Sequence, residues 1–357
     1  MNTIFAIIPW SEASAQDRMF IVDDPTKNVD HRNEPFLEMK QTIEKNGDVI
    51  HTIDYFEDLG RVDFFLFFEL NWDWIHKIVC HGFASRMVYC NAEPPSVNPL
   101  NSKEGFEKLG KIFPIILTWN DEWINNKNIF KRNIPYYFVD ERVQVAFSEK
   151  KLLTSISGNK KSKFPVELYS EREKVISFFE KNYPDQFEFY GTGWDNRIHP
   201  AYRGRVDNKA ETFHHYKFAI CFENVKNLSG YVTEKILNCI TSGIVPIYAG
   251  AKDIDKYVYP GCYIDYWAFR DCNQLADFLL NMKEKDYQGY LDEADRFLHS
   301  AELDAFKGER YAQYIYKAID HKIEFSVSLM ARINIWYKVT RQNVVRKIKN
   351  VVFKNNI

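Results

Sequence analysis

Residues Tyr216 to Gly250 read YKFAICFENVKNLSGYVTEKILNCITSGIVPIYAG, and this stretch decides the predicted fold. The apolar run Phe218 to Phe222 predicts a buried strand. A helix is expected from Thr233 to Gly243, because apolar residues recur at helical spacing before a glycine, and Ile244 to Tyr248 predicts the next strand. In such a β-α-β unit, polar residues gather at the carboxyl ends of the strands, and the free N–H groups at the helix start favour phosphate oxygens.

Three side chains at the start of this helix suit a sugar nucleotide. Tyr231 offers an aromatic ring, Glu234 an acceptor for sugar hydroxyls and Lys235 a positive charge for phosphate. A glutamate in a first helical turn is ordinary, since it complements the helix dipole, whereas a lysine there opposes the dipole unless an anion lies between them. The pattern therefore predicts an anion site that fits a nucleoside diphosphate.

The segments FxxCFEN, YVTEK and PIYxG together resemble the signature of the α-1,3-fucosyltransferases of glycosyltransferase family 10, in particular its bacterial members, and YGTGW, YRGRVDNK and PGCYIDYWAF add weaker similarity. The resemblance covers the second half of the chain well and the first half at scattered points. It implies an inverting, GDP-fucose-dependent enzyme with two Rossmann-like α/β domains facing a cleft, the GT-B architecture. It also implies that Lys235 contacts phosphate, that Glu234 binds the ribose hydroxyls, and that Asn224 and Tyr231 help to bind the donor.

Inverting glycosyl transfer needs a base for the acceptor hydroxyl and positive charge beside the departing diphosphate. Glu93 follows the predicted strand Met87 to Asn91 and precedes two prolines that stiffen the loop. Family members carry their proposed base in a similar position, so the resemblance makes Glu93 the candidate base. Without the resemblance, a solvated loop glutamate would be the simpler interpretation.

A second cation for the diphosphate is expected in the loop DNRIHPAYRGRV, because a guanidinium binds phosphate oxygens through two parallel hydrogen bonds. Arg197 is the preferred candidate, and Arg203 and Arg205 are the alternatives. Upstream, the sequence Ser170 to Glu173 has the form of a capping box and predicts a helix from Ser170 to Tyr183.

The triplet Asp253-Ile254-Asp255 has the form of a metal-binding D-x-D motif, but it lies in a hydrophilic turn that the resembled family does not use for metal. The expected reaction therefore requires no metal and no other cofactor, and stimulation by a divalent ion stays open.

At 357 residues the chain is long for one domain. One series of alternating strand and helix patterns occupies its first part, and a second series begins near Lys151. We expect an acceptor-binding α/β domain over 1–149, a GDP-fucose-binding α/β domain over 150–325 and a basic amphipathic tail over 326–357. The tail carries seven basic residues and no acidic one. It suits either contact with an anionic membrane or docking on the rest of the protein.

A formal net charge of −2 argues against a general nucleic-acid binder. The six cysteines show no C-x-x-C spacing, which favours a reducing compartment, and no segment has the roughly 20 apolar residues that span a bilayer. We therefore expect a cytoplasmic enzyme, with peripheral contact to the inner face of the cytoplasmic membrane as an option.

The expected partners are GDP-fucose and an oligosaccharide or glycolipid acceptor containing GlcNAc or glucose, with an α-1,3 linkage formed in surface-glycan or lipopolysaccharide synthesis. Two alternatives stay open. One is a transferase of the same fold that uses another nucleotide sugar, and the other is a catalytically silent protein that binds a glycan or a nucleotide. No motif identifies the acceptor or the oligomeric state.

Overall fold

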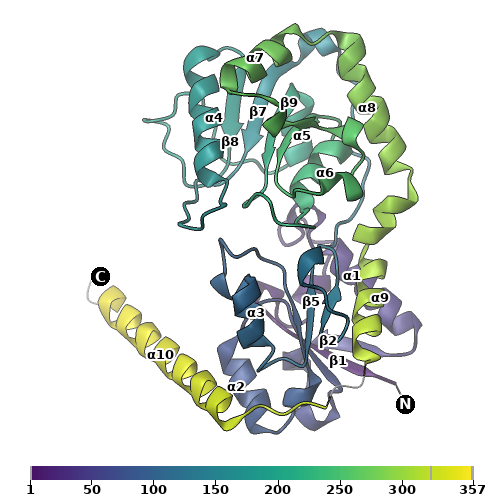
Figure 1. Ribbon diagram of the computed structural model, residues 1–357, viewed down its shortest axis with the longest axis vertical. Helices are drawn as coiled ribbons and strands as arrows, with labels where there is room; N and C mark the ends of the chain where they lie inside the picture. The colour runs from purple at the N-terminus through teal and green to yellow at the C-terminus, as the bar shows by residue number, and fades with distance from the viewer. Residues whose placement is uncertain (1, 322–323, 355–357) are drawn as a thin grey trace.

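The computed structural model describes residues 2–321 and 324–354, and it describes side chains of the last helix as far as Arg346. Two parallel sheets, one in each half of the chain, form the centres of two α/β domains (Figure 1). The strand order is β2-β1-β3-β4-β5-β6 in the first sheet and β11-β10-β9-β7-β8 in the second. The predicted fold class, two Rossmann-like α/β domains, is confirmed.

In the first domain, the four central strands of the sheet are buried on both faces, which explains their nearly continuous apolar sequences, whereas the two edge strands are buried in alternation. Its strands are β1 (Ile4–Ile8), β2 (Val49–Thr52), β3 (Phe64–Phe67), β4 (Met87–Cys90), β5 (Ile115–Thr118) and β6 (Ile129–Lys131). Its helices are α1 (Glu34–Lys45), α2 (Trp72–Cys80) and α3 (Lys103–Leu109).

The second domain contains the stretch that suggested the fold, and that stretch forms β9, α6 and β10. Strands β9 and β10 pair in parallel, with Ile220 opposite Ile247, so the predicted β-α-β unit is confirmed. The strands are β7 (Lys151–Ile156), β8 (Phe187–Tyr190), β9 (Tyr216–Phe222), β10 (Val245–Ala249) and β11 (Ile264–Asp265). The helices are α4 (Tyr169–Asn182), α5 (Lys209–His214), α6 (Glu234–Thr241) and α7 (Cys272–Asn281).

The predicted capping box at Ser170 is wrong. Helix α4 begins at Tyr169, and the carboxylate of Glu167 accepts hydrogen bonds from the backbone N–H groups of Tyr169 (2.6 Å) and Ser170 (3.1 Å). Thus Glu167, which precedes the first turn, supplies the capping acceptor in place of Ser170.

After the second sheet the chain returns to the first domain. Helix α8 (Glu284–Leu298) leads to α9 (Gly308–Ile319), which lies beside α1 (Figure 1). Tyr311, Ala312 and Ile315 of α9 are buried in the core of the first domain, although their range was assigned to the second.

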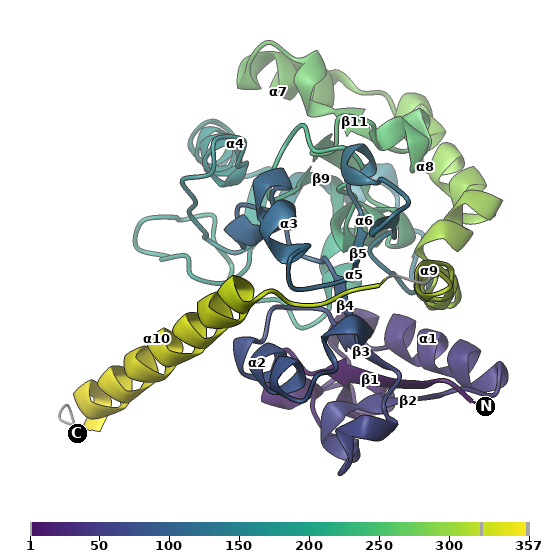
Figure 2. The same ribbon diagram turned by 60° about the horizontal axis from the view of Figure 1, so that its bottom comes forward.

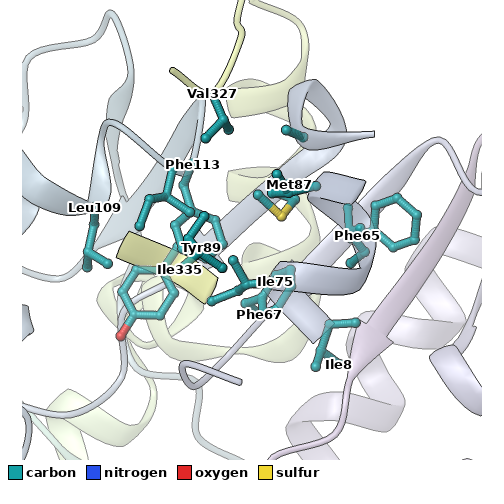
Figure 3. Close-up of a cluster of buried hydrophobic side chains, with 14 of the residues drawn as sticks. Ile8, Phe65, Phe67, Ile75, Met87, Tyr89, Leu109, Phe113, Val327 and Ile335 are labelled. Atoms are coloured by element: carbon teal, nitrogen blue, oxygen red, sulfur yellow. The ribbon is translucent and has the colours of Figure 1, made fainter. Parts of the chain in front are cut away.

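The last helix, α10 (Leu329–Lys354), packs on the first domain through its first half. Val327, Ala331 and Ile335 are buried in the same core as β3, β4 and α2, as Figure 3 shows for Val327 and Ile335. Farther along, Arg346 pairs with Asp73 of α2 at 2.8 Å, and the end of the helix extends away from both domains (Figure 2). Among the described residues, no helix combines the length and apolar character that crossing a bilayer would require.

Candidate active site

A cavity of about 250 Å³ lies where the two domains meet, lined by residues that follow β7 and β9 and by the start of α6. Glu93 reaches it from the first domain, and Asn224, Glu234 and Lys235 reach it from the second. The structure therefore brings four of the six predicted site residues together. Sequence reasoning missed the other cationic residues of the lining, which are Lys160, Arg172 and Lys209.

Lys235 is held at the helix start by a buried carboxylate. Its Nζ lies 2.9 Å from Oε2 of Glu223, which is fully buried, and 3.1 Å from Oγ1 of Thr233, the N-cap residue of α6. Burial opposes the charge on Lys235, but Glu223 and Glu234 outweigh burial and hold its pKa above the ordinary lysine value. Lys235 is therefore a fixed positive charge at a helix N-terminus, as a phosphate site needs.

Glu234 is the next residue on the same helix and lines the same cavity. Burial opposes its charge, but Lys235 and Lys209 outweigh burial, so the pKa of Glu234 lies below its ordinary value. It is ionised at neutral pH and can accept hydrogen bonds only, which matches the role of binding two sugar hydroxyls.

Glu93 lies in a loop whose backbone is tied to the first domain. Its carbonyl oxygen accepts from Nδ2 of Asn91 (2.9 Å) and Nδ2 of Asn101 (2.7 Å), and the carbonyl of Ala92 accepts from Nε1 of Trp119 (3.1 Å). The side chain is half-buried and faces the cations of the second domain. Burial, with Glu234 adding to it, raises the pKa of Glu93 against the opposing pull of Lys235 and Lys160. A positioned carboxylate of raised pKa is suited to take up a proton.

Arg172 is the buried cation of the site. It is 5% exposed, and its Nη2 donates to the carbonyl oxygens of Phe222 (2.6 Å) and Glu223 (3.1 Å) at the end of β9. It shares the inward face of α4 with Val175, Ile176 and Phe179. An arginine in register with this apolar stripe was the signal that sequence reasoning could have used.

The remaining predicted donor residue, Tyr231, is 2% exposed and does not line the cavity. Its ring packs on Trp119 of the first domain, with centroids 4.7 Å apart, and its hydroxyl accepts from Nδ2 of Asn224 at 3.4 Å. The structure thus places Tyr231 behind Asn224, where it positions that side chain and joins the two domains.

Of the three arginines in the upstream loop, none lines the cavity. The side chain of Arg197 is 85% exposed and pairs with Asp195 at 2.6 Å. Arg203 pairs with Glu188 at 2.8 Å, and Arg205 is exposed. The structure does not bring Arg197 to the other predicted donor residues, and its contact with phosphate stays a prediction.

The aspartates of the D-x-D triplet are engaged in local structure. Asp253 accepts from the backbone N–H of Gly230 at 2.8 Å and from the hydroxyl of Ser229, and Asp255 accepts from the hydroxyl of Tyr263. Within residues 2–321 and 324–354, no group of three or more His, Cys, Asp or Glu side chains is arranged to hold a metal ion.

Residues 150–309 match the family model described as glycosyltransferase family 10 (fucosyltransferase), C-terminal part. We call this matched segment, which is similar to that family, the family 10 domain. The match includes the cavity residues Arg172, Lys209, Asn224, Glu234 and Lys235 and leaves the domain that carries Glu93 outside.

Among curated relatives, the chain is 32% identical over 106 residues to the α-(1,3)-fucosyltransferase FucT of Helicobacter pylori, a match that covers 30% of this chain and 21% of that protein. It is 40% identical over 65 residues to an α-(1,4)-fucosyltransferase of Arabidopsis thaliana, covering 18% of this chain and 16% of the relative. The matches thus span about a fifth of these relatives or less.

Similarity of fold extends much further than similarity of sequence. A crystal structure of an α1,3-fucosyltransferase with GDP-fucose superposes with a TM-score of 0.56, covering 91% of this chain and 92% of that one at 14% identity. The family 10 domain is therefore one half of a two-domain arrangement of the GT-B type.

Proposed function

We propose that this protein transfers L-fucose from GDP-fucose, with inversion, to a hydroxyl group of a glycan acceptor that contains GlcNAc or glucose. One observation carries the proposal. A half-buried carboxylate from one domain, Glu93, and the fixed cation Lys235 from the family 10 domain line one cavity. The family match and the fucosyltransferase relatives support fucose as the sugar.

In the proposed reaction, Glu93 accepts the proton of the acceptor hydroxyl as its oxygen attacks C1 of fucose. The bond between C1 and the β-phosphate oxygen breaks, and GDP leaves with its negative charge held by Lys235. Glu234 binds the ribose hydroxyls. Arg172, already bonded to two carbonyl groups, adds positive potential to the same cavity. Each step uses side chains alone, so the scheme includes no metal ion.

An α-1,3 linkage and a role in surface-glycan or lipopolysaccharide synthesis are part of the proposal. The relatives include both α-(1,3)- and α-(1,4)-fucosyltransferases, so the linkage needs a direct test. Purified protein would be incubated with GDP-fucose and a panel of lactose, LacNAc and type 1 chains. Mass spectrometry would detect added deoxyhexose, and methylation analysis of the product would assign the linkage. No deoxyhexose on any acceptor, with GDP still bound, would favour a silent binding protein.

The second candidate function, a transferase that uses another nucleotide sugar, makes a different prediction for the same assay. Diphosphate and ribose contacts are common to all such donors, so Lys235 and Glu234 do not separate them. Turnover of UDP-glucose, UDP-galactose or GDP-mannose above that of GDP-fucose would establish this alternative.

We also propose that the enzyme acts at the inner face of the cytoplasmic membrane, to which α10 binds. Ala331, Ile335 and Val339 face the first domain. The opposite side of the helix presents Met330, Ile333 and Tyr337, which are 67%, 48% and 60% exposed, with Trp336 (57%) and Val344 (51%) nearby.

Exposed arginines, Arg332 and Arg341, flank this apolar stripe, and no acidic residue follows Glu324. Apolar side chains between basic ones suit shallow insertion among anionic lipid headgroups.

All six cysteines are unpaired, which agrees with a reducing compartment. They are Cys80, Cys90, Cys221, Cys239, Cys262 and Cys272.

Vesicle sedimentation tests the membrane contact. The protein should bind vesicles of phosphatidylcholine with phosphatidylglycerol and should not bind phosphatidylcholine alone. The double variant Ile333→Glu with Tyr337→Glu should lose binding, whereas Ile198→Glu, at an apolar side chain that is 70% exposed in a loop of the second domain, should keep it. Equal binding by all three proteins would refute the assignment to α10.

A further inference from the structure

A second cavity, of about 200 Å³, adjoins the first. Lys209 and Asn238 line both cavities, so the two are neighbours on the same surface of the family 10 domain. The second cavity is bounded by α5, by α6 and by two segments outside the quoted stretch, residues 25–31 and 136–141. It belongs to none of the roles assigned so far.

One side of α6 lines both cavities. Glu234, Asn238 and Ser242 follow one another at intervals of four residues, so they lie on one side of the helix. Eight residues of helix span about 12 Å. If Lys235 and Glu234 bind the phosphates and the ribose, the nucleobase extends from the ribose along this face, toward Asn238 and the second cavity.

The side chains of the second cavity offer the hydrogen-bonding groups that a guanine needs. Among the described residues, no donor lies within hydrogen-bonding distance of the Glu141 carboxylate, and Nε2 of His31 lies 4.0 Å from its Oε1. Oδ1 of Asn238 accepts from the hydroxyl of Tyr136 at 2.8 Å, which orients Nδ2 as a donor. Guanine presents two N–H donors, N1 and N2, beside the acceptor O6, and a carboxylate pairs with such adjacent donors through two bonds.

The segment that closes the cavity is held across the domains. Oδ2 of Asp30 lies 2.7 Å from Nζ of Lys209, and the rings of His31 and Tyr137 lie 5.8 Å apart. Asp30 and His31 both have positive φ, +52° and +56°, a backbone conformation that costs energy for residues other than glycine. The Asp30–Lys209 ion pair therefore holds a strained turn against the family 10 domain at the wall of the cavity.

We propose that the second cavity binds the nucleobase of the donor, and that the Glu141 carboxylate selects guanine through its N1–H and N2 amino groups. This inference rests on the proposed function for the identity of the donor. It adds a specificity-determining residue that lies outside the matched range 150–309.

Calorimetric titration of the full chain with GDP, IDP and XDP tests the inference. IDP lacks the 2-amino group, and XDP carries an oxygen in its place. The wild type should bind GDP roughly tenfold or more tightly than IDP, since a hydrogen bond to a charged acceptor is lost. Glu141→Gln should weaken the affinity for GDP by a similar factor and leave the affinity for IDP unchanged. It should bind XDP at least as tightly as GDP, because the amide NH₂ can donate to the xanthine oxygen. The control Glu57→Gln, at an exposed position of the first domain, should keep the wild-type order.

The outcomes separate this inference from the proposed function. UDP and ADP are titrated into the wild type in parallel, and a wild type that binds either one more tightly than GDP would contradict both. A wild type that prefers GDP, together with a Glu141→Gln protein that keeps the order GDP, IDP, XDP, would overturn only the role of Glu141. Loss of all nucleotide binding in Glu141→Gln would also overturn that role, because IDP should still bind.

Discussion

The substitution Glu223→Gln tests whether the buried carboxylate of Glu223 stabilises the fold and positions Lys235. The Glu223 side chain is fully buried and accepts from the backbone N–H of Thr233 (2.9 Å), from the hydroxyl of Thr233 (2.8 and 2.9 Å) and from Nζ of Lys235 (2.9 Å). Every one of these partners donates. Glutamine keeps one accepting oxygen and turns an NH₂ group toward the other donors, so the substitution removes the ion pair and sets donor against donor.

The expected cost follows from burial and from the number of bonds. A hydrogen bond to a charged group is worth about 1.5–3 kcal/mol, and removing one partner of a buried pair costs about 3–5 kcal/mol. The Lys235 side chain is 28% exposed, so water compensates for part of its loss. We expect unfolding to become easier by about 3 kcal/mol, which corresponds to a fall in Tm of roughly 6–12 °C for a unit of this size.

Urea denaturation followed by circular dichroism gives this free energy, and a thermal melt gives Tm. The matched control is Glu122→Gln. Glu122 pairs with Lys252 at 2.5 Å, but the two side chains are 54% and 45% exposed, so the same substitution should cost less than about 1 kcal/mol. Equal, small effects of the two substitutions would refute the claim that a buried carboxylate positions Lys235.

Two further predictions concern the junction of the domains. Burial, with Glu93 adding to it, raises the pKa of Glu69 from 4.5 to about 7. The folded protein thus binds this proton more tightly than the unfolded chain does. Below about pH 4.5 Glu69 is protonated in both states and does not destabilise the fold, whereas above about pH 7 it is ionised in both states and destabilises the fold fully. In urea titrations, Glu69→Gln should therefore be more stable than wild type by roughly 2 kcal/mol at pH 8 and by little at pH 4.5. A gain independent of pH would contradict the cause. Gly230 has φ +74°, and an added Cβ would lie 2.2 Å from the carbonyl oxygen of Trp119, whereas Gly47 has φ +86° with nothing within 4 Å. Gly230→Ala should therefore lower the free energy of unfolding by about 2–4 kcal/mol and Gly47→Ala by about 1 kcal/mol, and similar losses would show that the contact with Trp119 is unimportant.

The fold was largely predictable because buried parallel strands leave a plain trace in sequence. The run Phe218 to Phe222 lies within β9, and the predicted helix from Thr233 to Gly243 contains α6, with Thr233 as its N-cap. Sequence reasoning could not foresee that Tyr311 and Ile315 would pack in the first domain, because an amphipathic helix shows which face is buried but not against which sheet.

The candidate site was predictable where the chain order itself places the residues. Glu234 and Lys235 begin the helix that follows β9, and Glu93 follows β4, so the topology alone carries each of them to the carboxyl ends of the strands of its own sheet. Arg197 and Tyr231 depend instead on loop geometry and on packing between domains. Arg197 lies on the surface beside Asp195, and Tyr231 is buried against Trp119. Arg172 was missed because its place at the site depends on α4 packing beside the end of β9, where Arg172 meets the carbonyl groups of two residues that are far from it in sequence.

In the proposed reaction, Glu93 acts as the base toward a donor held by the other domain. Single-turnover fucosyl transfer by Glu93→Gln, measured beside its affinity for GDP, tests it most directly. We predict that the rate falls by about 10²–10⁴ while the Kd for GDP stays within about twofold of the wild-type value. A Glu93→Gln enzyme that transfers fucose at the wild-type rate would contradict the account.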